Sequence, residues 1–140
     1  MATITAGITI SSSDMMDNIV SISNQTLLTK AGNDTGLSET TGLARKKTSS
    51  GSNTILLDTN DTTGSDVTAQ KAAKVYIKNM NDRGDGTKYV TILLEDTEIG
   101  RLYGGDWMFM PWDATGAGKD IEFTASDTTE TTIEYMAFFE

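Results

Sequence analysis

The stretch Thr-Thr-Ile-Glu-Tyr-Met-Ala-Phe-Phe-Glu, residues 131–140, decides the fold class of this chain. Ile133, Tyr135, Ala137 and Phe139 alternate with Glu134, Met136 and Phe138, which is the period of two of a β-strand. We expect the first set to fill a core. Met136 and Phe138 would then lie on the opposite face, where they contact a neighbouring subunit or, for Phe138, cover an edge of their own domain.

Shorter stretches of the same kind precede this strand. Alternating or apolar segments end at turn signals such as Asn81–Gly86, with its Asp85-Gly86 pair, Glu98–Gly100 and Gly104-Gly105. The segments are Lys74–Asn79, Tyr89–Glu95, Ile99–Tyr103, Trp107–Trp112 and Ile121–Ala125. Short strands at this spacing predict an all-β fold, an antiparallel β-sandwich, and long-range pairing of its strands would make it jelly-roll-like.

The N-terminal half is rich in Thr, Ser, Gly and Asn and poor in aromatic residues. Residues 2–10 alternate as a half-buried strand. For Asp17–Lys30 we favour a strand, although Leu27 and Leu28 could close a short helix. We therefore predict N-terminal strands and an extended arm over residues 1–66 and the sandwich core over residues 67–140, in one continuous domain.

Composition narrows the chemistry that this chain could perform. The sequence has 140 residues without histidine or cysteine, which removes the usual catalytic triads, zinc hydrolases and thiol enzymes. The net charge of −9 repels phosphate backbones, so we expect no nucleic-acid partner. No apolar run approaches the roughly 20 residues of a membrane span, so we expect no membrane partner.

The sequence contains no complete motif for catalysis or metal binding. Asp58-x-Asn60-Asp61 begins like a calcium loop, but Thr63 replaces its glycine and Ala69 its bidentate glutamate. A loose Ca²⁺ site through Asp82 and Asp85 stays open as an alternative. No spacing singles out a pair of catalytic carboxylates. We predict no enzymatic activity, no cofactor and no metal site.

The segment Trp107–Trp112 is apolar on both faces of the expected strand. Trp107, Phe109 and Pro111 would share one face, and Met108, Met110 and Trp112 the other. Aromatic and Met side chains are common at protein interfaces. We expect one face in the core and one at a docking or oligomer interface. A sugar platform of Trp107 or Trp112 beside Asp106 is the alternative.

Two further motifs are candidates for surface contact. Arg45-Lys46-Lys47 is a basic cluster in an acidic chain, and it forms a solvated surface or pairs with the acidic C-terminal half of a neighbouring copy. Arg83-Gly84-Asp85 spells an integrin-type tripeptide, but its Asp-Gly pair is explained by a hairpin turn alone.

The C-terminal half resembles small virion proteins of marine and cyanobacterial tailed phages. The resemblance is carried by weak motifs: a strand containing Tyr-Ile-Lys-Asn (76–79), then Glu98–Trp107 and Met110–Trp112, then Ile121–Ala125, and a closing strand with Glu134-Tyr135 before a Phe-rich end. It covers about half of the chain and carries no functional residue over. It implies a β-sandwich that decorates a capsid or belongs to a tail or head fibre.

These observations lead us to expect a capsid decoration (cement) protein. It would bind the major capsid protein on the outside of the virion, after synthesis in the host cytoplasm, and form a homo-oligomer, with a trimer among the possible arrangements. A tail or fibre accessory protein that binds a carbohydrate receptor is the alternative. The interface candidates are Trp107, Met108, Phe109, Met110, Trp112, Met136, Phe138, Arg45, Lys46 and Lys47.

Overall fold

The computed structural model describes residues 4–14, 19–29, 39–48, 51–59, 72–84, 88–114, 118–126 and 130–139. Within these ranges the chain forms strands and no helix, which confirms the predicted all-β class. The strands are β1 (Ile4–Ser12), β2 (Val20–Leu28), β3 (Glu39–Thr40), β4 (Ala44–Thr48), β5 (Thr54–Leu57), β6 (Ala72–Asn79), β7 (Tyr89–Leu94), β8 (Thr97–Tyr103), β9 (Trp107–Asp113), β10 (Ile121–Ala125) and β11 (Thr131–Phe139).

The chain divides into two compact units. One comprises Met1–Ser38 together with Glu140, and the other comprises Glu39–Phe139. This division differs from the one predicted at residues 66 and 67. The reason is that β4 and β5, which precede residue 66, are paired with β11 and β10 and therefore belong to the sandwich.

The first unit contains a long antiparallel hairpin of β1 and β2. Its register runs without interruption from Ile4 opposite Leu28 to Ser12 opposite Val20. The strand favoured for the Asp17–Lys30 region is thus confirmed over the helix. Alternation gives the hairpin one face with Ile8, Ile10 and Ile22 and a second face of Thr, Ser, Gly and Gln residues, together with Leu27.

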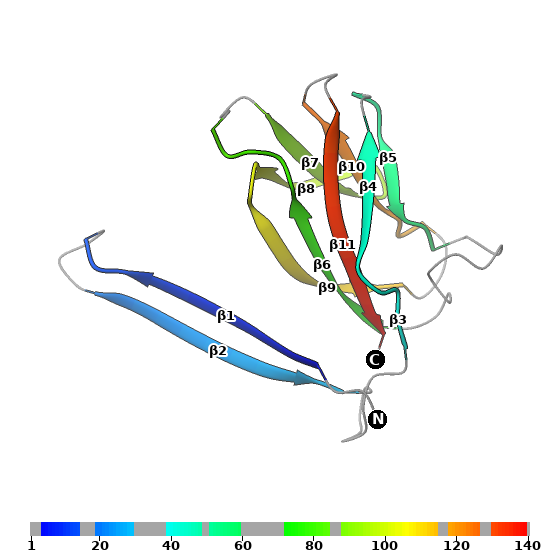
Figure 1. Cartoon of the computed structure of the whole chain (residues 1–140). Helices are drawn as coiled ribbons and strands as arrows, with labels where there is room; N and C mark the ends of the chain where they lie inside the picture. The colour runs from blue at the N-terminus through cyan, green and yellow to red at the C-terminus, as the bar shows by residue number, and fades with distance from the viewer. Residues whose placement is uncertain are drawn as a thin grey trace. The chain divides into compact units, whose positions relative to one another are not determined.

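The second unit is a sandwich of two antiparallel sheets, shown in Figure 1. The first, which we call the β6 sheet, has the order β3-β11-β6-β9, and β4 also pairs with β11. The second, which we call the β7 sheet, has the order β5-β10-β7-β8. Successive strands therefore cross repeatedly from one sheet to the other.

The strand pairs of the sandwich are nested in the sequence. Strand β7 pairs with β8, β6 with β9, β5 with β10 and β4 with β11. The additional pairs β11–β6 and β10–β7 join these hairpin-like pairs into the two sheets. One long folded-over hairpin rolled into two sheets is the topology of a jelly roll, so the predicted jelly-roll-like sandwich is confirmed.

The core lies between the inner faces of the two sheets. Each inner face is built from alternate residues, because successive side chains of a strand point to opposite sides. Strand β11 contributes Ile133, Tyr135, Ala137 and Phe139, as its alternation predicts. The remaining core residues are Leu56, Leu57, Val75, Ile77, Val90, Ile92, Leu102, Trp112, Ala114, Ile121 and Phe123.

The β7–β8 connection differs from the predicted one. The turn is at Glu95-Asp96, with φ values of 45° and 60°, and not at Glu98–Gly100. Two successive residues with positive φ form the tight turn that suits the twist of a hairpin, usually with Asn-Gly. Here the backbone N–H of Glu95 donates to the Asp120 carbonyl at 3.0 Å, which anchors the turn without glycine. The predicted Asp85-Gly86 turn lies outside the described residues.

Candidate functional site

The outer face of the β6 sheet gathers aromatic and cationic side chains. It is built by β4, β11, β6 and β9, which lie side by side in register. Rows of residues therefore cross the sheet, and one such row contains Arg45, Glu134, Lys78 and Trp107. We call this outer face the docking face. It comprises Arg45, Lys47, Lys74, Tyr76, Lys78, Trp107, Phe109, Pro111, Glu134, Met136 and Phe138.

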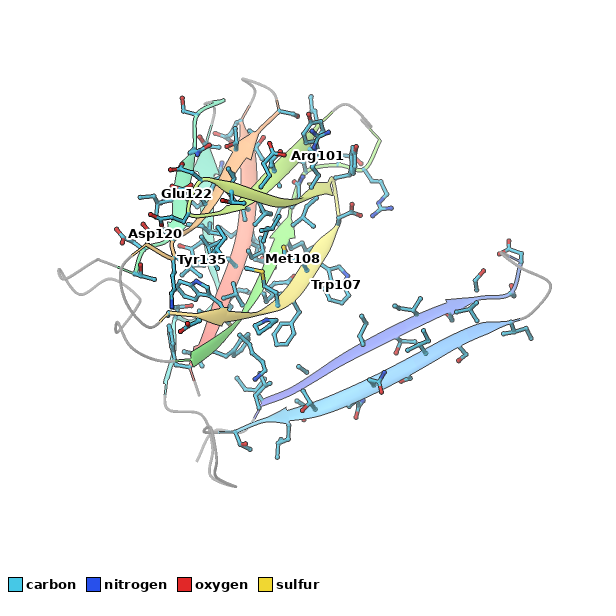
Figure 2. All side chains as sticks on the ribbon, turned by 180° about the vertical axis from the view of Figure 1, so that it is seen from behind. Arg101, Trp107, Met108, Asp120, Glu122 and Tyr135 are labelled. Atoms are coloured by element: carbon cyan, nitrogen blue, oxygen red, sulfur yellow. The ribbon has the colours of Figure 1, made fainter. Side chains whose placement is uncertain are left out.

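Strand β9 settles which face of Trp107–Trp112 is exposed. Trp107 is 48% exposed and Phe109 is also exposed, so these rings belong to the docking face. Figure 2 shows Trp107 directed away from the sandwich and Met108 directed toward its interior. Met108 and Met110 pack against the core, and Trp112 is only 4% exposed within it.

Three of the interface candidates therefore belong to the interior. Met108, Met110 and Trp112 cannot present their side chains to a partner while they pack in or against the core of the sandwich. The indole Nε1 of Trp112 donates to the carbonyl of Lys119 at 2.8 Å, which satisfies its one polar atom. Trp112 is likewise removed as a sugar platform.

Strand β11 contributes Met136 and Phe138 to the docking face. The ring centroids of Phe109 and Phe138 are 6.2 Å apart and their planes are tilted by 60°, a favourable arrangement for two aromatic rings. Phe138 itself is buried, whereas Met136 is half-buried. Phe138 is on the predicted face, but it supports the exposed Phe109 ring and offers little surface of its own to a partner.

Strand alternation splits the basic cluster of β4. Arg45 and Lys47 lie on the docking face, where they pair with Glu134 at 2.9 Å and with Glu130 at 2.7 Å. Lys46 lies on the other side of β4, and its Nζ donates to the carbonyl of Ile55 on β5 at 2.5 Å. Lys46 therefore joins the edges of the two sheets and is not part of the docking face.

Strand β6 adds residues that sequence reasoning did not nominate. Lys74, Tyr76 and Lys78 alternate with the core residues Val75 and Ile77, so they lie on the docking face. The signal was the alternation of Lys74–Asn79, which predicts that these three residues share a face. What the sequence lacked was the neighbour of β6, because β9 and β11 are distant from it along the chain.

A buried carboxylate organises the centre of the docking face. Glu134 is buried, pairs with Arg45 and forms a hydrogen bond with the side chain of Tyr76. Burial, followed by the adjacent negative charge of Glu134 and this hydrogen bond, raises the pKa of Tyr76 above its ordinary value of 10.0. The Tyr76 hydroxyl therefore keeps its proton, which it can donate to this carboxylate, to a higher pH than an ordinary tyrosine does.

The outer face of the β7 sheet has the opposite charge. Its residues Glu98 and Glu122 lie near the acidic turn Glu95-Asp96. The Cζ atom of Arg101 lies 4.5 Å from the centroid of the Tyr89 ring, over which the guanidinium group stacks. Arg101 and Glu122 are both labelled in Figure 2. The chain has a net charge of −9, so the lysines and arginine of the docking face form a local exception to its negative field.

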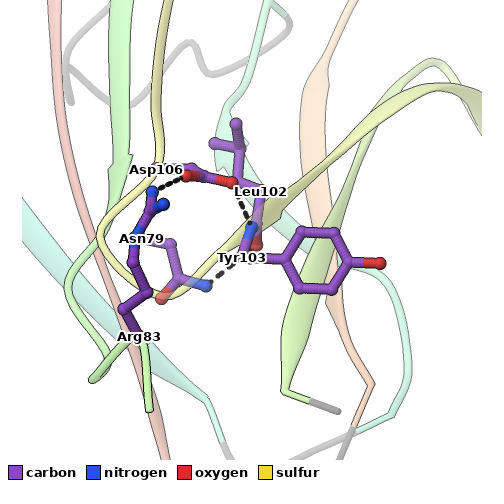
Figure 3. A network of polar contacts seen from close by, with 5 residues as sticks. All are labelled: Asn79, Arg83, Leu102, Tyr103 and Asp106. Carbon is purple, nitrogen blue, oxygen red and sulfur yellow. Dashed lines mark hydrogen bonds and ion pairs between the residues drawn. The ribbon is translucent and has the colours of Figure 1, made fainter. Parts of the chain in front are cut away.

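A polar network fixes the end of the docking face beside Trp107 (Figure 3). Asn79 is fully buried, and its Nδ2 donates to the Leu102 carbonyl at 3.0 Å. One oxygen of Asp106 accepts from the Tyr103 backbone N–H at 3.0 Å, and the other pairs with Arg83. Both carboxylate oxygens of Asp106 therefore have partners within the sandwich. One of these partners is Arg83 of the integrin-type tripeptide.

No cluster of three or more His, Cys, Asp or Glu side chains that could hold a metal ion occurs among the described residues. The alternative Ca²⁺ site includes Asp85, which lies outside them. Within the described ranges no helix has the length and apolar character of a membrane span. No family model matches this chain, and no curated protein matches its sequence.

Proposed function

We propose that this chain is a structural protein of a virus particle, a decoration (cement) protein that binds the outer surface of major capsid subunits and stabilises the head. The docking face is the surface that makes this contact, and the chain has no enzymatic role. Three kinds of observation support the proposal: the resemblance of the C-terminal half to phage virion proteins, the jelly-roll topology and the character of the docking face. Jelly rolls are frequent in viral capsid domains, and also in lectins.

The observation that carries the proposal is the exposed pair Trp107 and Phe109 on the docking face. Trp is the residue most enriched where binding energy concentrates at interfaces, and such residues lie at the centre of a contact with polar residues around them. Here Lys78 is directly opposite Trp107 in the register of β6 and β9. Lys78 forms no ion pair with a described residue, so it is available for a carboxylate on the partner.

The chemistry of the docking face predicts the character of the partner surface. Apolar area around Trp107 and Phe109 requires an apolar patch, and the surrounding cations favour acidic side chains. Charge complementarity of this kind increases the rate of association and selects the partner, while the buried rings supply affinity. A capsid surface with an apolar patch surrounded by carboxylates would fit.

The test measures binding of the purified protein to particles assembled without it. The Trp107→Asp variant should lose roughly thirty-fold or more in affinity, because an anchor residue contributes about 2 kcal/mol or more. The matched control is Ile99→Asp, since Ile99 is 44% exposed on the β7 sheet, almost as exposed as Trp107. Unchanged occupancy of particles by Trp107→Asp would count against the proposal.

A tail or fibre protein that binds carbohydrate is the second candidate, and one observation favours it. Trp107 presents an exposed ring, on which a sugar could stack. The two functions differ in the position and number of copies on the intact particle: many copies over the head for decoration, and few copies at the tail or fibre for the second function. Binding of the isolated protein to a glycan array, abolished by Trp107→Ala, would favour the carbohydrate function.

A further inference from the structure

Strand β9 forms one edge of the β6 sheet, because β6 is its neighbour on one side and no described strand pairs with its other side. Its register with β6 runs from Trp107 to Asp113 without a shift. An edge strand presents a row of unpaired backbone N–H and C=O groups, to which another extended chain can bind. The direction of each backbone group decides what this edge can accept.

A hydrogen bond of Asn79 shows which residues of β9 direct their backbone groups outward. The N–H of Asn79 donates to the carbonyl of Asp106 at 3.0 Å, so these residues form a hydrogen-bonded pair. Pairs along an antiparallel ladder alternate between hydrogen-bonded and non-hydrogen-bonded pairs. Trp107 and Phe109 fall in the non-hydrogen-bonded pairs, so their N–H and C=O groups point away from β6. The described residues supply no partner for these outward groups.

Pro111 limits the length of the strand that this edge can accept. It has the same place in the alternation as Trp107 and Phe109, so its nitrogen, which carries no hydrogen, also points outward. A proline at such a position leaves the ladder with β6 intact and removes one donor from the free edge. A short segment can therefore pair fully with Trp107 and Phe109, whereas a longer strand loses a hydrogen bond at Pro111.

The other edges of the sandwich carry more of the usual protection against strand addition. Strand β3 has two residues, and β4 carries the basic cluster. The pairs β7–β8 and β10–β5 contain register shifts, and Lys46 donates to the carbonyl of Ile55 on β5. Short edges, lysines and bulges all oppose edge pairing. Strand β9 has no charged residue from Trp107 to Trp112, so it is the described edge best suited to strand addition.

The exposed rings of Trp107 and Phe109 lie beside this free edge. Same-face side chains on neighbouring strands have Cβ atoms about 4.5–5.5 Å apart, so alternate residues of an added strand would contact these rings. Lys78 is opposite Trp107 on the inner side, where its long side chain favours a carboxylate on the added strand. In complexes of this kind the main-chain hydrogen bonds supply affinity and the alternate side chains supply specificity.

Charge decides between a capsid segment and a second copy of this chain. Two-fold pairing of β9 with the same strand of another copy would bring Lys74 and Lys78 of both copies to one side of the joined sheet. Residues 107–112 supply no carboxylate between these cations. We infer that the capsid partner docks by adding a short extended segment, which carries a carboxylate side chain, to the β9 edge at Trp107 and Phe109. This inference rests on the proposed function and specifies how the docking face holds its partner.

Replacing a single backbone N–H by an ester oxygen tests these directions in the free protein. The ester at Phe109, with 3-phenyllactic acid in place of phenylalanine, keeps the ring and should change the urea midpoint little. The ester at Met108 should lower the midpoint clearly, because Met108 forms a hydrogen-bonded pair with Ile77. A loss of stability at Phe109 as large as that at Met108 would overturn the inference.

The same Phe109 ester tests the docking mode on particles assembled without the protein. It should bind roughly five- to ten-fold more weakly than the unmodified chain, because one intermolecular backbone hydrogen bond is lost. Phe109→Pro should bind more weakly than Phe109→Ala, since both lack the ring and proline also lacks the N–H. Equal affinities within both pairs, with Trp107→Asp still defective, would overturn strand addition and leave the proposed function standing.

Two results with the wild-type chain separate the remaining alternatives. A wild-type chain that does not bind the particles would overturn the proposed function and this inference with it. Sedimentation of the free chain reports whether a second copy occupies the edge. A dimer that the Phe109 ester abolishes would place a second copy on β9 and overturn its assignment to a capsid segment.

Discussion

Asn79 and Leu102 connect the two sheets of the sandwich: the Nδ2 of Asn79 on β6 donates to the carbonyl of Leu102 on β8 at 3.0 Å. The Oδ1 of Asn79 accepts from the backbone N–H of Asn81 at 3.0 Å. Because Asn79 is fully buried, both polar atoms of its amide group depend on these partners. The network beside Trp107 is therefore a structural joint between the sheets.

Replacing Asn79 by Ala should lower the free energy of unfolding by about 2–3 kcal/mol, because the Leu102 carbonyl and the Asn81 N–H lose their partner. Asn79→Asp should be at least as damaging, since a carboxylate would face the Leu102 carbonyl. Urea unfolding measures both effects. Asn53→Ala is the control: Asn53 also forms side-chain hydrogen bonds but is exposed, and a smaller loss of about 1 kcal/mol or less is expected.

Gly104→Ala should destabilise the sandwich by about 1–3 kcal/mol, the usual range for overpacking. A Cβ at this position would lie 2.2 Å from the backbone oxygen of Asp82, which can move only with its chain. Gly100→Ala is the matched control, because a Cβ there would have no heavy atom within 4 Å and the φ of Gly100 is not in the left-handed region. Equal thermal midpoints for the two variants would contradict this account of Gly104.

Substitutions of Trp112 and Trp107 should distinguish a loss of stability from a loss of docking. Trp112→Ala should cost about 3–5 kcal/mol in unfolding free energy, because it empties part of the core and leaves the Lys119 carbonyl unpaired. Trp107→Ala should change stability by less than about 1 kcal/mol. These are the two tryptophans of the chain, so each variant reports the other ring by fluorescence. The emission of Trp112 should lie at shorter wavelength and resist quenching by iodide.

Stability should fall as Tyr76 ionises. Its pKa is raised in the folded state, so below the ordinary value of 10.0 both states hold the proton and the contribution of Tyr76 is fully present. As the pH rises through 10.0, Tyr76 ionises first in the unfolded state. The contribution of Tyr76 to stability is lost as the pH approaches its higher pKa in the folded state. Tyr76→Phe should be about 1 kcal/mol less stable near neutral pH, and this difference should shrink in alkali. A difference that does not change with pH would contradict the role of the Tyr76–Glu134 contact.

The sequence was sufficient for the class of the fold and for the faces of individual strands. Alternation correctly separated Ile133 and Tyr135 from Glu134 and Met136, and it divided Trp107 and Phe109 from Met108 and Met110. It could not say which of the two β9 faces enters the core, because both are apolar. The pairing with β6 determines which face of β9 enters the core. Val75 and Ile77 of β6 point inward, so Met110 and Met108, which lie opposite them on β9, point inward as well.

The remaining differences arise from long-range pairing and from an unusual turn. The arm predicted up to residue 66 includes β4 and β5, which are short and distant in the sequence from β11 and β10, the strands that incorporate them. The β7–β8 turn at Glu95-Asp96 lacks the expected glycine, because Asp120 and Glu122 supply hydrogen bonds that hold it. Lys46 does not share a face with Arg45 and Lys47, because neighbouring residues of a strand face opposite ways.

The nesting of the strand pairs also determines how long a strand is synthesised before its partner. Arg45 precedes its partner Glu134 by 89 residues, so at ordinary translation rates it waits roughly 4–18 seconds for that partner. During this interval β4 is an unpaired edge, which would invite aggregation if it were apolar. Its sequence Ala-Arg-Lys-Lys-Thr carries three successive cations instead. The basic cluster can thus act as a gatekeeper that keeps the nascent chain soluble until the last strand arrives.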